Sequence, residues 1–229
     1  MQKSRKQTHK PADESALLMA MYEEMLSALG PRGWWPGKTR FEVCVGAILT
    51  QNTAWRNVKK AIGNLKAAGV LDPKKMDTLD TGELARLIVP SGYYNIKAKR
   101  LKNFTGMLAD EFGGSLTKLF RLPAMELRDK LLGVNGIGRE TADSIVLYAA
   151  GKPMFVVDAY TRRIGSRHGL FPADADYETM RQYFTDRLPE DTQLFNEYHA
   201  LIVCVGNRYC GTTPACEECP LLRFLHNND

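Results

Sequence analysis

The chain has 229 residues and a mass of 25.7 kDa, and its 31 Lys and Arg against 26 Asp and Glu give a formal net charge of +5. This length allows one substantial core or two small helical lobes and excludes a long multidomain protein, while the positive charge is compatible with a polyanionic partner. The apolar stretches fall far short of the ~20 residues that cross a bilayer, and the basic N-terminus lacks the apolar core of a signal peptide, so we expect a cytoplasmic protein without a membrane span.

Helical periodicity dominates the chain after a loose basic tail at residues 1–14. Apolar residues recur every three or four positions, and Gly or Pro follows most of these stripes as a stop signal. The stripes predict helices over 16–29, 41–49, 55–68, 83–89, 96–112, 123–132 and 140–150. Three further helices begin after the capping residues Asp158, Asp176 and Asp191 and reach about 168, 188 and 205. MFVV at 154–157 is strand-like, but we interpret it as an extended connection, so the chain is predicted to be all-α.

A tight turn at residues 136–138 joins two of these helical patterns. Such a turn leaves backbone N–H groups open at the start of the second helix, where the helix dipole favours a phosphate. Gly136 and Gly138 would let a DNA backbone approach, and Ile137 would pack back between the helices. Taken alone, the turn is equally compatible with an ordinary helix–helix connection.

The sequence VVDAYTRR follows one helix later and places Asp158 20 residues beyond Gly138. This combination, with the loop that contains Pro153, resembles the helix-hairpin-helix, Gly/Pro-rich loop and aspartate signature of the endonuclease III superfamily of DNA glycosylases. The resemblance implies two helical lobes with a DNA cleft between them, one of residues 37–152 and one of residues 15–36 and 153–229. It also implies that Asp158 is catalytic. The alternative is that Asp158 only caps its helix, which stabilises a helix by ~1 kcal/mol.

A carboxylate suits this chemistry, because breaking an N-glycosidic bond builds positive charge on the deoxyribose. The base must first leave the helical stack, and the resemblance places Gln51, in LTQNT, where the family's glutamine enters the gap. SGYYNIKAKRL at 91–101 resembles another family stretch, whose basic residues would face phosphates or form a solvated face. The expected DNA contacts are Gly136, Ile137, Gly138, Arg139, Thr141, Lys97, Lys99 and Arg162.

A departure from the family pattern bears on the reaction. Members that also cut the backbone carry a lysine nucleophile in the second hairpin helix, and here Glu140 stands at that position. A carboxylate cannot form an imine, and Arg139 stays protonated. We therefore expect a monofunctional glycosylase that leaves an abasic site, with weak AP-lyase activity at most.

The base specificity is predicted from Trp34, Trp35 and Pro36, which match the bacterial 3-methyladenine DNA glycosylase branch. Indole faces favour a cationic methylated purine through cation–π contact, so these residues are expected to line the base pocket with Gln51 and Glu140. They could instead pack the N-terminal helix onto the core. Two other functions stay open: a glycosylase for uracil, mismatched thymine or oxidised pyrimidines, and a non-catalytic DNA-binding protein. In each case the expected partner is double-stranded DNA, bound by a monomer associated with a bacterial or archaeal nucleoid.

Four of the five cysteines lie between 204 and 219 and suit a [4Fe–4S] cluster better than zinc. The superfamily's usual pattern is C-x6-C-x2-C-x5-C, and Cys210, Cys216 and Cys219 match three of its ligands. The fourth position, 225, is Leu. Cys204 is our preferred fourth ligand and His226 the alternative. Cys44 is expected to be a small buried hydrophobe.

Overall fold

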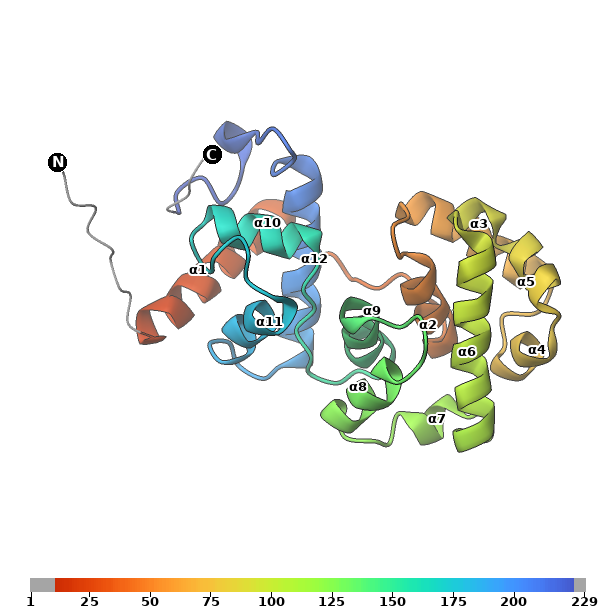
Figure 1. Cartoon of the computed structure of the whole chain (residues 1–229). Helices are drawn as coiled ribbons and strands as arrows, with labels where there is room; N and C mark the ends of the chain where they lie inside the picture. Colours follow the sequence, from red (N-terminus) through yellow and green to blue (C-terminus); the bar gives the residue numbers. More distant parts are fainter. Residues whose placement is uncertain (1–10, 225–229) are drawn as a thin grey trace. The chain divides into compact units, whose positions relative to one another are not determined.

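The computed structural model describes residues 11–224, and every regular element in that range is helical (Figure 1). This confirms the all-α prediction. None of the described helices is long and apolar enough to span a bilayer. The chain divides into two compact units, one of Trp35–Met154 and one that combines the chain up to Trp34 with the chain from Phe155 onward. These boundaries lie within two residues of the expected ones.

The Trp35–Met154 unit is built around one helix that is buried on all sides. Each residue from Phe41 to Leu49 in α2 is buried, as the continuous sequence FEVCVGAIL requires. Cys44, within this run, is fully buried as expected. The elements of this unit are α2 (Arg40–Leu49), α3 (Trp55–Ala67), α4 (Pro73–Thr78), α5 (Thr81–Leu87), η1 (Val89–Ser91), α6 (Tyr94–Phe112), α7 (Leu116–Leu119), α8 (Ala124–Leu132), α9 (Arg139–Ser144) and the π-helical turn η2 (Ile145–Ala149).

The other unit packs α12 (Thr192–Arg208) against α10 (Ala159–Arg167) and α1 (Pro11–Leu29). It also contains α11 (Tyr177–Thr185) and the short η3 (Cys216–Glu218). Its core is aromatic, with Phe155 stacked on Phe184 at a centroid distance of 4.1 Å. At Gly206 an added Cβ would lie 2.3 Å from Tyr160, so the absence of a side chain there lets α10 and α12 approach closely.

Apart from shifts of two or three residues at helix ends, the helices differ from the prediction in three respects. Helix α1 begins at Pro11, inside the expected tail, and residues 1–10 lie outside the described range. Helices α4 and α7 were not predicted, because segments of six and four residues are too short for a periodic stripe. The expected helix over 140–150 changes at Ile145 into a π-helical turn, a distortion that is frequent at functional sites. Residues 154–157 are extended and buried without forming a strand, as predicted.

Candidate nucleic-acid interface and active site

The hairpin consists of α8, a six-residue loop and α9. Gly136 has φ +96°, and a Cβ there would lie 2.3 Å from Cγ of Arg100. This position therefore requires glycine both for its backbone conformation and for the space that Arg100 occupies. Ile137 is buried, as expected, and its N–H donates to the Val134 carbonyl at 3.0 Å. Gly138 begins α9 with open space around its Cα, and within the described chain no side chain caps this end. The backbone there can therefore be approached by an anion.

A buried ion pair joins the two hairpin helices. Nε of Arg128 in α8 donates to Oδ1 of Asp143 in α9 at 2.6 Å, and the two side chains are 7% and 0% exposed. Because either charge alone would be costly to bury, the pair fixes α8 and α9 to each other. Sequence reasoning assigned no role to Asp143, although a carboxylate inside an apolar run is a signal for a buried partner.

Gln51 lies just beyond α2, and its side-chain amide points to the hairpin. Nε2 donates to the Gly136 carbonyl at 3.0 Å and to the Thr141 hydroxyl at 2.9 Å. Oε1 accepts from Nη1 of Arg100. The structure thus brings the expected gap-filling residue and the expected phosphate-binding turn together. Thr141, predicted to contact DNA, is buried, and its hydroxyl is used by Gln51.

Lys97 does not face solvent and is not positioned for the phosphate contact expected of it. Its side chain is buried, and Nζ donates to the Leu49 carbonyl at 2.9 Å, the Ser91 carbonyl at 2.7 Å and the Thr53 hydroxyl at 2.6 Å. Burial, followed by the charge of Arg100, lowers the pKa of Lys97 to about 8. All three of its N–H donors are used to hold the segment around Gln51. Lys99, by contrast, is exposed.

Tyr93 is a surface candidate that sequence reasoning missed. It is 68% exposed and has φ +46°, an uncommon conformation for a non-glycine residue. It follows Ser91, whose carbonyl accepts from Thr53 in the Gln51 segment. An exposed aromatic ring beside these residues can stack on a base. The signal was present in SGYYN, but only the basic residues of that stretch were singled out.

Trp35 sits in an aromatic cluster of its own unit. Its indole meets Trp55 edge-on at 5.1 Å and lies 5.3 Å from Tyr148, which the π-helical turn carries. A Cβ at Gly46 would lie 3.2 Å from the indole, so α2 also touches the ring. Pro36 lines a hollow of about 200 Å³ with Trp55. Trp34 is half-buried and falls in the other unit. The cluster fixes the orientation of Trp35, which is half-buried.

Asp158 is the N-cap of α10, and its two carboxylate oxygens have different neighbours. Oδ1 accepts from the Thr161 N–H at 2.7 Å and from the Thr161 hydroxyl at 2.9 Å. Oδ2 lies 3.7 Å from Nε2 of His199 in α12. Burial raises the pKa of Asp158, but the His199 side chain and the two Thr161 groups lower it by more, so it lies below its ordinary value. The carboxylate is therefore ionised at neutral pH, as charge stabilisation at the sugar requires.

The arginines behind Asp158 are used within the protein. Nη1 of Arg162, expected at DNA, donates to the Ala175 carbonyl at 2.7 Å. Arg163 donates from Nε to the Cys210 carbonyl at 2.6 Å, and Arg167 from Nη1 to Cys210 Sγ at 3.1 Å. Together, Arg163 and Arg167 tie α10 to the cysteine-containing C-terminal segment.

Three of the four expected ligands lie in the C-terminal segment that contains η3, with Cys210 buried and Cys216 and Cys219 half-buried. Burial raises the pKa of the Cys219 thiol, a backbone hydrogen bond of Leu221 lowers it, and Cys210 and Cys216 raise it further. The three thiols suit a thiolate-bound metal group by donor type. Among the described residues, however, no three Cys, His, Asp or Glu side chains are gathered as a metal-binding group. Cys204 lies one residue before Val205 in α12, half-buried, and position 226 is outside the described range.

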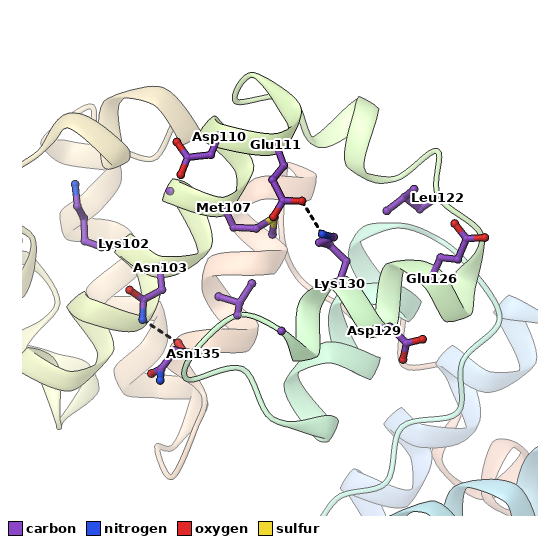
Figure 2. A pocket seen from close by; sticks show the side chains of 13 residues that line it. Lys102, Asn103, Met107, Asp110, Glu111, Leu122, Glu126, Asp129, Lys130 and Asn135 are labelled. Carbon is purple, nitrogen blue, oxygen red and sulfur yellow. Dashed lines mark hydrogen bonds and ion pairs between the residues drawn. The ribbon is translucent and has the colours of Figure 1, made fainter.

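A hollow of about 900 Å³ lies between α6, α8 and the first half of the hairpin loop (Figure 2). Its charged lining consists of four carboxylates, Asp110, Glu111, Glu126 and Asp129, and two lysines, Lys102 and Lys130. Lys130 pairs with Glu111 at 2.6 Å. Because acids outnumber bases in this lining, the hollow is unsuited to a phosphate backbone.

The sequence profile of the HhH-GPD superfamily base excision DNA repair protein matches residues 45–190, which include the hairpin and Asp158. The chain therefore belongs to this superfamily. It is a DNA glycosylase of the base excision repair kind, a hydrolase that acts on N-glycosyl bonds.

Relatives support this placement. A candidate DNA repair glycosylase of Methanocaldococcus jannaschii is 44% identical over 210 residues, which cover 91% of this chain and 95% of the relative. Endonuclease III of Thermotoga maritima is 31% identical over 189 residues, covering 82% of this chain and 81% of the relative. Both branches named by the sequence resemblance also occur among solved structures.

The crystal structure of H. pylori 3-methyladenine DNA glycosylase bound to 1,N6-ethenoadenine has a TM-score of 0.73 and 29% identity, covering 85% of this chain and 97% of that one. A non-covalent endonuclease III–DNA complex has a TM-score of 0.79, with 92% of this chain and 94% of that one covered. Its identity to this chain is 23%, so it shows the fold alone.

Proposed function

We propose that the chain is a monofunctional glycosylase that hydrolyses the N-glycosidic bond of an alkylated purine in duplex DNA, acting as a monomer. The observation that carries this proposal is the ionised Asp158 carboxylate at the start of α10. Once the base is flipped out, the carboxylate stabilises positive charge on the deoxyribose as the bond to the base lengthens. The bond breaks with its electron pair on the damaged base, a water adds at the anomeric carbon in place of that base, and the proton that this water loses passes to the Asp158 carboxylate.

DNA contacts are proposed for both units. In the Trp35–Met154 unit, the open backbone at Gly138 and the neighbouring Arg139 would meet phosphates, and Lys99 would add a surface charge. Gln51 and Tyr93 would occupy the space that the flipped nucleotide leaves, or stack beside it. The reacting carboxylate proposed is that of Asp158, at the start of α10.

The absence of strong lyase activity rests on Glu140. This residue is exposed on the first turn of α9, at the position where the resemblance expects the amine nucleophile. Lys97, four residues into α6, is occupied by three acceptors and is buried, so it does not replace that amine. Hydrolysis by water is the chemistry that these residues support.

The preference for an alkylated purine rests on Trp35. Its ring is held by Trp55 and Tyr148, and an electron-rich face of this kind favours a cationic base. The H. pylori relative with 29% identity binds 1,N6-ethenoadenine, which is a modified purine. Similarity to endonuclease III of Thermotoga maritima supports an oxidised pyrimidine as the second candidate substrate.

We propose that Cys210, Cys216 and Cys219 hold a [4Fe–4S] cluster, with Cys204 as the fourth ligand. The donor set fits, because soft thiolates bind iron–sulfur groups and Arg167 donates to the sulfur of Cys210. When bound, such a group would hold the C-terminal cysteine segment in place and would not act as an acid or a base. Brown protein with absorption near ~400 nm is expected, lost in Cys216→Ser and kept in Cys44→Ser.

The deciding experiment presents the protein with duplexes that each carry one defined lesion: 1,N6-ethenoadenine, 3-methyladenine, uracil, mismatched thymine or an oxidised pyrimidine. Release of the purines without strand cleavage or borohydride trapping is the expected result. Release of oxidised pyrimidines alone would replace the proposed substrate by the second candidate. No release from any duplex, with tight binding retained, would indicate the non-catalytic alternative.

A further inference from the structure

One oxygen of the Asp158 carboxyl is committed to the helix, and the other faces a buried histidine. Thr161 bonds to Oδ1 through its N–H and its hydroxyl, so this oxygen caps α10. Oδ2 lies 3.7 Å from Nε2 of His199. The side chains of His199 and Asp158 are 7% and 12% exposed, so little water reaches the space around them.

His199 is held in place by the packing of its helix. It lies in the middle of α12, which packs against both α10 and α1. The neighbouring Tyr198 is buried, and its hydroxyl donates to the Leu18 carbonyl at 2.9 Å, which fixes this turn of α12 on α1. Gly206, farther along α12, allows the close approach to Tyr160 that sets the distance between the two helices.

His199 and Thr161 are the described residues that lower the pKa of the Asp158 carboxyl against the effect of burial. Thr161 acts on the capping oxygen, which leaves His199 as the group beside Oδ2. Eight charged groups on the surrounding helices α1, α10, α11 and α12 are engaged elsewhere, in ion pairs or on backbone groups: Glu14, Glu24, Arg162, Arg163, Arg167, Glu178, Arg181 and Glu197.

We propose that His199 is the positioning residue of the active site, which orients Oδ2 of Asp158 and keeps this oxygen in its anionic form. This inference rests on the proposed function, because it assigns a task to the carboxylate that performs it. An imidazole edge 3.7 Å from Oδ2 suits both tasks: it restrains rotation of the carboxyl about its bond to the β-carbon, and it offers a positive edge in a place with little water.

Three variants separate positioning from packing. His199→Phe keeps a planar ring and removes the donor, while His199→Gln keeps an N–H donor near the same place. Tyr198→Phe is the matched control, since it removes a buried hydrogen bond from the same turn of α12 without touching Asp158. The rate constant of base release from a 1,N6-ethenoadenine duplex is measured in single turnover from pH 4.5 to 8.

For His199→Phe we expect a rate constant roughly 10- to 100-fold lower at pH 7, which is the size of effect that misplacement of a reacting group causes. Its acid limb should move to higher pH, with duplex affinity unchanged. His199→Gln should recover most of the rate, and Tyr198→Phe should keep the wild-type pH profile. An acid limb that stays in place in His199→Phe would overturn the proposal.

A second measurement does not depend on activity. Carbon NMR of protein labelled at the Asp carboxyl carbons, with Asp158→Asn to assign the resonance, follows the titration of Asp158 directly. The Asp158 signal should titrate at higher pH in His199→Phe than in the wild-type protein, and identical titrations would refute the inference. If the wild type releases no base, the proposed function fails, yet this comparison still decides whether His199 governs Asp158.

Discussion

Asp158 performs two tasks that two substitutions can separate. Asn keeps a side-chain oxygen that accepts the Thr161 N–H, and Asn and Asp are similarly good N-caps, so Asp158→Asn should unfold within about 1 °C of the wild type. Ala removes the cap, which costs ~1 kcal/mol or a fall in Tm of ~2–4 °C for a protein of this size. Both variants lose the negative charge.

Base release should therefore fall in both variants, by about 10²–10³-fold for the loss of one group that stabilises the developing charge. Single-turnover base release and thermal unfolding, measured on the same samples, test this. Duplex affinity serves as the control and should not change. The reasoning is refuted if Asp158→Asn keeps its turnover, or if the loss of turnover in the two variants only follows their loss of stability.

Three further predictions concern the Trp35–Met154 unit. Gly136→Ala should destabilise the protein by ~1–3 kcal/mol, because its Cβ would clash with the Arg100 side chain and because φ is positive there. Gly138→Ala should fold normally and bind duplex DNA more weakly. Urea unfolding and DNA titration compare the two variants. The pKa of Lys97 is about 8 in the folded protein and ~10.4 in the unfolded chain, so between these two pH values the unfolded chain binds more protons. The free energy of unfolding should therefore rise with pH from about 8 to ~10.4. Lys97→Met should not show this rise in thermal unfolding. Glu140→Lys should introduce borohydride-trapped covalent adduct, and an adduct already present in the wild type would contradict monofunctional hydrolysis.

The helical class and the capping role of Asp158 could be predicted because they depend on local patterns. Apolar stripes with helical spacing, Gly residues that end helices and an Asp before a helix are all visible within a short stretch of sequence. The hairpin turn belongs to the same group, since Ile137 is buried and Gly138 is open as the turn sequence implied.

The partners of buried polar groups could not be predicted, because they come from distant segments. Lys97 reads as a surface cation in KAKR, yet its acceptors lie around residue 50 and at Ser91. His199 stands 41 positions after Asp158, and nothing in YHALI marks it as a neighbour of a carboxylate. Glycines at 136 and 206 signal close approach, but the side chains that approach them, Arg100 and Tyr160, emerge only from the fold.

The amide of Gln51 is engaged at both ends before any duplex arrives. If it is to enter DNA, it must give up its bonds to Gly136, Thr141 and Arg100, each with a net value of ~1 kcal/mol. The binding free energy that Gln51 contributes is thus only the difference between its hydrogen bonds in the DNA gap and those that it already makes in the hairpin. An intact, well-stacked base pair offers no gap, whereas a damaged nucleotide leaves its stack at lower cost. The hydrogen bonds of the free protein therefore set a minimum free energy that a DNA site must provide before Gln51 enters it. Sites with weakly stacked nucleotides provide this free energy most readily.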